Sequence, residues 1–96
     1  MQDMLLTDDQ IDAALDQLDV AWSALPGQGL VRVYETGSFD EGLQLTAKIA
    51  KLADTLDHHP DLRLQSNEVE VTLLSHEQGG ITQKDVAMAK AIDQLS

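Results

Sequence analysis

Hydrophobic and polar positions near the start of the chain recur with the period of a helix. Thr7 followed by Gln10 has the form of a capping box, in which two side chains three residues apart satisfy free backbone amides. One face then carries Ile11, Ala14, Leu15 and Leu18. The pattern predicts a first helix over residues 7–18.

Turn-forming residues separate this helix from a short run with strand character. Pro26, Gly27 and Gly29 break the chain, and residues 30–35 (LVRVYE) are rich in β-branched and aromatic side chains. We predict a strand here, as the candidate second strand of a hairpin whose first strand includes Trp22.

The longest predicted helix covers residues 38–56, which contain no proline. Ser38 and Glu41 repeat the capping-box spacing at its start. Its apolar residues follow two adjoining tracks, which are Leu43, Ala47 and Ala50, and Leu45, Ile49, Leu52 and Leu56. A band this wide exceeds what one sheet face requires. Two interpretations stay open: a deeply buried helix, and a helix that also packs on a partner subunit.

Alternation of apolar and polar residues predicts two more strands after this helix. The apolar positions are Leu62 and Leu64 in the first, and Val69, Val71 and Leu73 in the second. Ser66 and Asn67 lie between them and suit a turn, so we expect an antiparallel hairpin. Beyond Gly79 and Gly80, Thr82 is the predicted cap of a last helix that has Asp85 at its third position.

The predicted order of elements is helix, two strands, helix, two strands, helix. Strands that follow one another without an intervening helix favour antiparallel pairing. We therefore predict an α+β fold, with a four-stranded antiparallel sheet covered by helices on one face. The length of 96 residues fits a single domain over residues 1–96.

Composition and charge narrow the classes of function. The formal net charge is −11, and the six cationic residues are spread singly along the chain, whereas a phosphate backbone requires clustered cations. We expect no direct nucleic-acid binding. The chain contains no cysteine, which excludes disulfides and thiol catalysis. It also has no apolar run long enough for a membrane span, so we expect a cytoplasmic protein. Because a short chain buries little surface alone, a homo-oligomer is physically useful.

Histidine provides the candidate chemistry, because all three histidines are predicted to meet. His58 and His59 precede Pro60, which ends helical geometry and places them where the long helix turns into a loop. His76 follows the last predicted strand, and pairing of the final hairpin returns that strand end to the neighbourhood of His59. Asp57 and Asp85 are carboxylates available to orient or charge an imidazole.

Three explanations compete for this cluster. A histidine at a helix C-terminus complements the helix dipole, which suffices for His58 or His59 alone. A zinc site is a poorer explanation, because adjacent histidines point in different directions at most backbone geometries. Metal-free acid and base catalysis is the third, since imidazole has an ordinary pKa of about 6.5.

Two segments carry a family resemblance that extends over nearly the whole chain. Residues 54–61 (DTLDHHPD) and 75–85 (SHEQGGITQKD) resemble the pterin-4a-carbinolamine dehydratases, also known through a dimerization cofactor of a homeodomain transcription factor. The residues that match the family pattern in order and spacing are Asp54, His58, His59, Pro60, His76 and Asp85.

The resemblance implies a dehydratase that removes water from 4a-hydroxytetrahydropterin to give quinonoid dihydropterin, during recycling of the tetrahydropterin used by aromatic amino-acid hydroxylases. It implies proton transfer by His58 and His76, and substrate holding by His59. Neither a metal nor an organic cofactor is implied. Four further residues are expected to bind substrate or support the histidines: Asp57, Ser75, Glu77 and Asp85.

The role of Asp85 has a structural alternative. As the third residue after its helix cap, it can instead bond the backbone of Thr82. We expect that one carboxylate does not easily serve both the cap and an imidazole.

One departure from the family pattern concerns the aromatic residue expected six positions beyond the proline, which is Ser66 here. Such a ring could wall the flat pterin or pack under the histidines. The candidates to replace it are Trp22, Tyr34 and Phe39, although Phe39 is expected in the core. The departure keeps a second function open, that of a dehydratase-like binding or assembly factor. The resemblance also implies homodimers through sheet edges and homotetramers through the long helix.

Overall fold

The computed structural model describes residues 4–95 and confirms the predicted order of elements. The helices and strands are α1 (Asp8–Leu15), β1 (Ser23–Leu25), β2 (Gly29–Glu35), α2 (Phe39–Leu56), β3 (Asp61–Gln65), β4 (Glu68–Leu73) and α3 (Gln83–Asp93).

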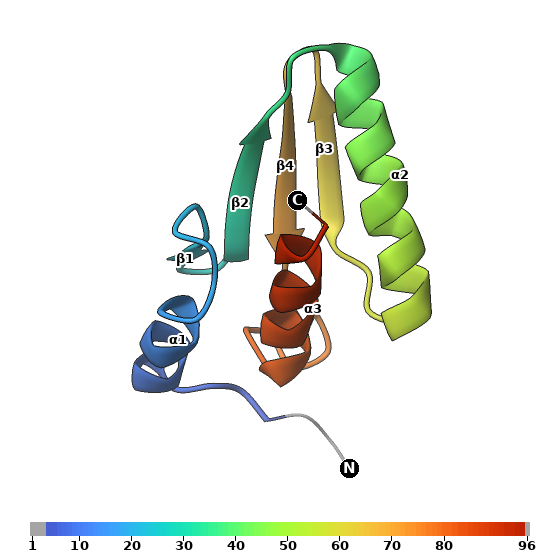
Figure 1. Ribbon diagram of the computed structural model, residues 1–96. Helices are drawn as coiled ribbons and strands as arrows, with labels where there is room; N and C mark the ends of the chain where they lie inside the picture. Colours follow the sequence, from blue (N-terminus) through green and yellow to red (C-terminus); the bar gives the residue numbers. More distant parts are fainter. Residues whose placement is uncertain (1–3, 96) are drawn as a thin grey trace.

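The four strands form one antiparallel sheet in the order β1-β2-β4-β3, with β1 and β3 at its edges. Helices α2 and α3 lie together on one face of this sheet (Figure 1). Alternation explains the arrangement, because Val69, Val71 and Leu73 of the central strand β4 all point toward the helices and are fully buried. The α+β prediction is confirmed.

The hydrophobic core lies between the sheet and the two long helices. Helix α2 contributes Ile49 and Ala53, while Met88, Ala89 and Ile92 from α3 are fully buried. Leu45 and Leu52 pack against this core from α2. The track of Leu45, Ile49 and Leu52 is therefore the face of α2 that covers the sheet.

The other predicted track of α2 faces solvent. Leu43 is 50% exposed, and Ala47 and Ala50 are also exposed. Phe39 is 54% exposed, so the expectation that it belongs to the core is wrong. It sits in the first turn of α2, on the same solvent-facing side of the helix as Leu43.

Caps fix the beginnings of all three helices as the sequence predicts, with two adjustments. Thr7 and Gln10 form the full capping box of α1, which is shorter than expected and ends at Leu15. Ser38 accepts the Glu41 amide, but the Glu41 carboxylate accepts from the amide of Gly37 instead of completing a box with Ser38.

Trp22 is not part of the first strand. Strand β1 has only three residues and begins immediately after the tryptophan. The indole is 4% exposed and donates a 2.7 Å hydrogen bond to a carboxylate oxygen of Asp93 in α3. Trp22, which was predicted to pair in the hairpin, instead links the segment before β1 to α3 through this hydrogen bond.

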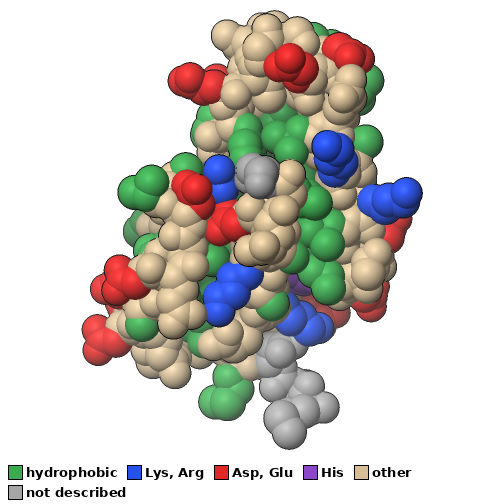
Figure 2. Space-filling model, in the orientation of Figure 1, with side chains coloured by type: hydrophobic (Ala, Val, Ile, Leu, Met, Phe, Trp, Pro, Cys, Tyr) green, Lys and Arg blue, Asp and Glu red, His purple; other side chains and the backbone are tan. Residues whose placement is uncertain are grey.

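Surface charge is dispersed over the face shown in Figure 2, where Lys and Arg side chains lie apart from one another. Within residues 4–95, no helix has the length and apolar character needed to cross a membrane.

Candidate active site

The first histidine is positioned by the way α2 ends. The amide of His58 donates to the carbonyl of Ala53 at 3.1 Å, and the amide of Asp57 donates to the carbonyl of Asp54. These two bonds form a Schellman motif, which requires a left-handed residue between them. Asp57 is that residue, with φ 52° and ψ 42°. Asp57 therefore provides the left-handed turn that precedes His58.

The imidazole of His58 reaches from this turn to the start of α3. Its Nε2 lies 2.6 Å from Oδ1 of Asp85, and the two side chains are 14% and 0% exposed. A carboxylate oxygen only accepts, so Nε2 carries the proton and Nδ1 is the nitrogen left for another partner. A buried carboxylate thus fixes both the tautomer and the orientation of His58.

Asp85 also caps α3 with its second oxygen. Oδ2 accepts from the amide of Thr82 at 2.9 Å and from the hydroxyl of Ser75, also at 2.9 Å. The expectation that one carboxylate could not serve both the cap and an imidazole is wrong. The two oxygens of the carboxylate point to different partners, so each task has its own acceptor.

Hydroxyl groups complete the buried side of this network. Ser75 and Thr82 are 4% and 0% exposed, and their hydroxyl oxygens lie 2.8 Å apart. Because Ser75 donates its single proton to Asp85, the hydroxyl of Thr82 must donate to Ser75. Both oxygens of the buried carboxylate therefore accept hydrogen bonds, and the Ser75 hydroxyl both donates and accepts, as burial in a low-dielectric site requires.

The other two histidines are open to solvent. Nε2 of His59 lies 2.9 Å from a carboxylate oxygen of Asp54, and these side chains are 61% and 79% exposed. His76 is 68% exposed, and its Nε2 lies 3.9 Å from Asp61. Each imidazole faces a carboxylate, but only the carboxylate that faces His58, that of Asp85, is buried.

A tight loop brings His76 to the other two. Ser75 pairs with Gly80 in an isolated antiparallel bridge, and the amide of Gly79 donates to the carbonyl of Ser75 at 2.9 Å. Gly79 has φ 75°, a conformation that glycine adopts without strain. The loop thereby turns His76 toward the beginning of β3 instead of continuing β4.

The three histidines line one pocket of about 340 Å³. Its other lining residues are Asp57, Leu74, Ser75, Glu77, Gln78 and Lys84. Every predicted site residue lines it except Asp85, which lies buried behind His58. Sequence reasoning missed Lys84, although its position directly before Asp85 at the start of a helix was a usable signal.

Ser66 does not belong to this pocket. It lies in the turn that joins β3 to β4, whereas the histidines gather where β3 begins and β4 ends. Five residues of strand separate the two ends, roughly 17 Å. The expectation that an aromatic at this position could pack under the histidines of the same chain is therefore wrong.

A family model described as pterin 4 alpha carbinolamine dehydratase matches residues 4–95. The chain belongs to this family. Relatives that carry the name "Putative pterin-4-alpha-carbinolamine dehydratase" include one from Mycobacterium avium (strain 104), 43% identical over 91 residues, which are 95% of each chain. Another, from Thermomicrobium roseum, is 37% identical and covers 97% of this chain and 99% of its own.

A solved structure shares the fold of this member of the pterin carbinolamine dehydratase family. The crystal structure described as a transcriptional coactivator/pterin dehydratase from Brucella melitensis has a TM-score of 0.86 and 32% sequence identity. The match covers 95% of this chain and 97% of the other. The likeness therefore extends over nearly the whole of both chains.

Metal ligation was one of the explanations for the histidine cluster in this dehydratase-family chain. Among the residues that the structure describes, no three His, Asp or Glu side chains are grouped so that they could hold a metal ion. Asp54, Asp61 and Asp85 each face a different histidine.

Proposed function

We propose that the protein dehydrates pterin-4a-carbinolamine to quinonoid dihydropterin, in the recycling of a tetrahydropterin. The observation that carries the proposal is the convergence of three imidazoles on one pocket, with one of them fixed by a buried carboxylate. A pocket of about 340 Å³ lies in the size range of small-molecule sites. Membership of the family supports the choice of substrate.

The reaction needs one proton donor and one proton acceptor. The bond between C4a and the hydroxyl oxygen breaks, and the oxygen leaves as water when an acid protonates it. A ring nitrogen gives up its proton to a base, and its electron pair forms the new double bond. We assign these two transfers to His58 and His76, which come from different segments and can stand on different sides of a flat ring.

His58 is the better ordered of the two proton-transfer groups. Since Nε2 is held by Asp85, only Nδ1 can exchange a proton with the substrate. The negative charge of Asp85 stabilises the imidazolium that forms when Nδ1 takes a proton, as a buried aspartate does in hydrolase triads. Asp85 and Ser75 act through His58 and are positioning residues.

Three other groups are assigned to substrate holding. His59, on the exposed side, is placed to hold the substrate near the reacting carbon. Glu77 and Lys84 line the same pocket and offer an acceptor and a donor for the polar edge of a pterin.

A direct assay tests the proposal. We expect the protein to accelerate dehydration of 4a-hydroxytetrahydropterin above the buffer rate, and His58→Ala and His76→Ala to reduce kcat by about 100-fold. His59→Ala should act more on KM. Arg63→Ala, an exposed change on β3 outside the pocket, is the control and should leave both constants unchanged. A parent protein no faster than buffer contradicts the proposal.

A second role in protein binding is favoured by the exposed track of α2. We call the four exposed residues Phe39, Leu43, Ala47 and Ala50 the α2 stripe. They recur at helical spacing on one face, which is how a helix presents an apolar seam to a partner. We propose that the α2 stripe packs against further copies of this chain in a homo-oligomer.

A further inference from the structure

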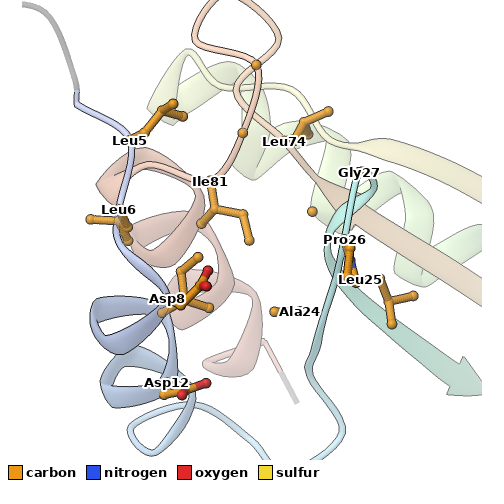
Figure 3. A pocket seen from close by; sticks show the side chains of 14 residues that line it. Leu5, Leu6, Asp8, Asp12, Ala24, Leu25, Pro26, Gly27, Leu74 and Ile81 are labelled. Carbon is orange, nitrogen blue, oxygen red and sulfur yellow. The ribbon is translucent and has the colours of Figure 1, made fainter.

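A second cavity is larger than the histidine pocket, and no histidine is among the described residues that line it. It has a volume of about 540 Å³ and lies between α1 with the segment before it, the turn that joins β1 to β2, and residues 79–81 (Figure 3). Neither the proposed reaction nor the α2 stripe uses it. The amide of Leu6 donates to the carbonyl of Ile81 at 2.9 Å, which holds one wall of the cavity to another.

Most of the lining is apolar. Ile81 is buried, and Leu6, Ile11 and Ala24 are partly buried and pack against the core. Leu5 and Leu25 are 52% and 39% exposed at the open side. A concave space of this size, lined by apolar side chains with few polar groups, has the features of a small-molecule site.

Within residues 4–95, the polar side chains that line the cavity are both carboxylates. Asp8 and Asp12 lie one turn apart on α1, and Figure 3 shows both side chains on the side of the helix that faces the β1–β2 turn. The helix dipole favours an acidic residue such as Asp8 in the first turn of α1. It does not explain Asp12, which lies in the middle of the helix. None of the described residues that line the cavity is Lys, Arg or His.

We propose that this cavity binds a small apolar molecule that carries one primary ammonium group. The apolar body would replace water against the leucine and isoleucine side chains, and the ammonium group would lie between the carboxylates of Asp8 and Asp12. The net charge of −11 favours approach of such a cation and disfavours an anion of the same shape.

The site adjoins the loop that carries His76. Leu74 lines both this cavity and the histidine pocket, and Gly79 and Gly80 belong to the same loop as His76. Backbone amides of this loop therefore report on occupancy of the cavity.

Titration of the full chain with n-octylammonium, followed by ¹⁵N-resolved NMR, tests the proposal. We expect saturable shifts at the amides of Gly27, Gly79 and Gly80. n-Octanoate has the same chain length and the opposite charge, so it should bind at least about tenfold more weakly. Equal affinities for the two probes, or shifts dispersed over the whole surface, would overturn the proposal.

Charge variants separate the site from the general attraction of an acidic protein. Asp8→Asn with Asp12→Asn should weaken n-octylammonium binding about threefold to tenfold, the factor expected for contacts with two exposed carboxylates. Asp9→Asn with Asp16→Asn changes the same helix and the same net charge outside the cavity, and should weaken it less than about twofold. Equal losses in the two variants contradict the site.

A filling variant and a concentration series complete the test. Ala24→Phe places a ring in the cavity and should abolish the saturable shifts, while Val20→Phe, at a residue that is 98% exposed, should not. If the glycine amides instead shift with protein concentration alone, a second copy of the chain covers the cavity and the proposal fails.

Discussion

Asp85 holds the imidazole of His58 with one carboxylate oxygen and the N-terminus of α3 with the other. The pair lies where three segments meet, because Ser75 from the loop after β4 also donates to this carboxylate. The orientation of the first histidine is therefore coupled to the start of the last helix. A change at Asp85 has two separable consequences, one for the chemistry and one for stability.

Asp85→Asn is expected to reduce kcat strongly and to reduce the stability of the fold only modestly. The amide oxygen can still accept from Thr82, but the side chain no longer supplies a charge or a second acceptor for His58. We expect kcat for pterin dehydration to fall by about 100-fold, with KM nearly unchanged. Loss of the hydrogen bond with His58 should lower the free energy of unfolding by about 1 kcal/mol. Steady-state kinetics and urea unfolding on the same preparations measure both.

Ser75→Ala provides the matched comparison for Asp85. It removes one donor to the carboxylate but leaves the bonds from His58 and Thr82 in place. We expect a loss of about 1 kcal/mol in stability and a reduction in kcat of less than about tenfold. A reduction as large as that of Asp85→Asn would show that Ser75 has a direct part in the chemistry.

Asp57→Gly tests whether this residue acts through its backbone. A left-handed conformation disfavours residues with a Cβ by roughly 1–2 kcal/mol, and glycine avoids this penalty. We expect Asp57→Gly to unfold at the same or a higher urea concentration and to retain activity. Asp57→Val should be less stable by at least about 1 kcal/mol. If Asp57→Gly is stable but inactive, the carboxylate itself takes part in the reaction.

The convergence of the histidines was predictable because it follows from local rules. Helix α2 ends at Leu56, and Pro60 keeps the following histidines out of helical geometry. Hairpin pairing of β3 with β4 then returns the chain to them. The helix caps at Thr7 and Thr82 could also be predicted from the sequence, since each depends only on residues a few positions apart.

Exposure could not be predicted in the same way. The sequence shows that α2 has a wide apolar band, but which track covers the sheet depends on how the helix is rotated in three dimensions. Phe39 and Leu43 therefore proved to be exposed, while Leu45 packs against the core. Similarly, the double role of Asp85 depends on the angle at which α3 meets the end of α2. The spacing of residues along the chain does not predict that angle.

Leu43→Glu is expected to reduce the oligomeric state. The leucine lies in the middle of the α2 stripe and is 50% exposed, so a charge there leaves the fold intact but opposes apolar contact between copies. Sedimentation equilibrium should show a lower mass than for the parent. Gln44→Glu adds the same charge to the neighbouring exposed position outside the stripe and should leave the mass unchanged. Identical masses for the parent and Leu43→Glu would show that the α2 stripe is not an interface between copies of the chain.

Arg32 and Asp93 form a largely buried ion pair, remote from the histidines. The guanidinium lies 2.5 Å from Oδ1 of Asp93, with side chains 10% and 16% exposed, and the same oxygen accepts from the indole of Trp22. Arg32 also lies over the ring of Tyr34, 4.1 Å from its centre. This cluster joins β2 to the end of α3.

Removing only one member of this pair should be more harmful than removing both. Asp93→Leu leaves Arg32 buried without its nearest carboxylate, which typically costs about 3 kcal/mol. Asp93→Leu combined with Arg32→Met removes both charges, so we expect a smaller loss than the sum of the two single changes. Urea unfolding of the parent, the two single variants and the double variant measures these losses. The fluorescence of Trp22, the single tryptophan, reports on the environment of the indole during unfolding. Additive losses would show that the two side chains stabilise the fold independently.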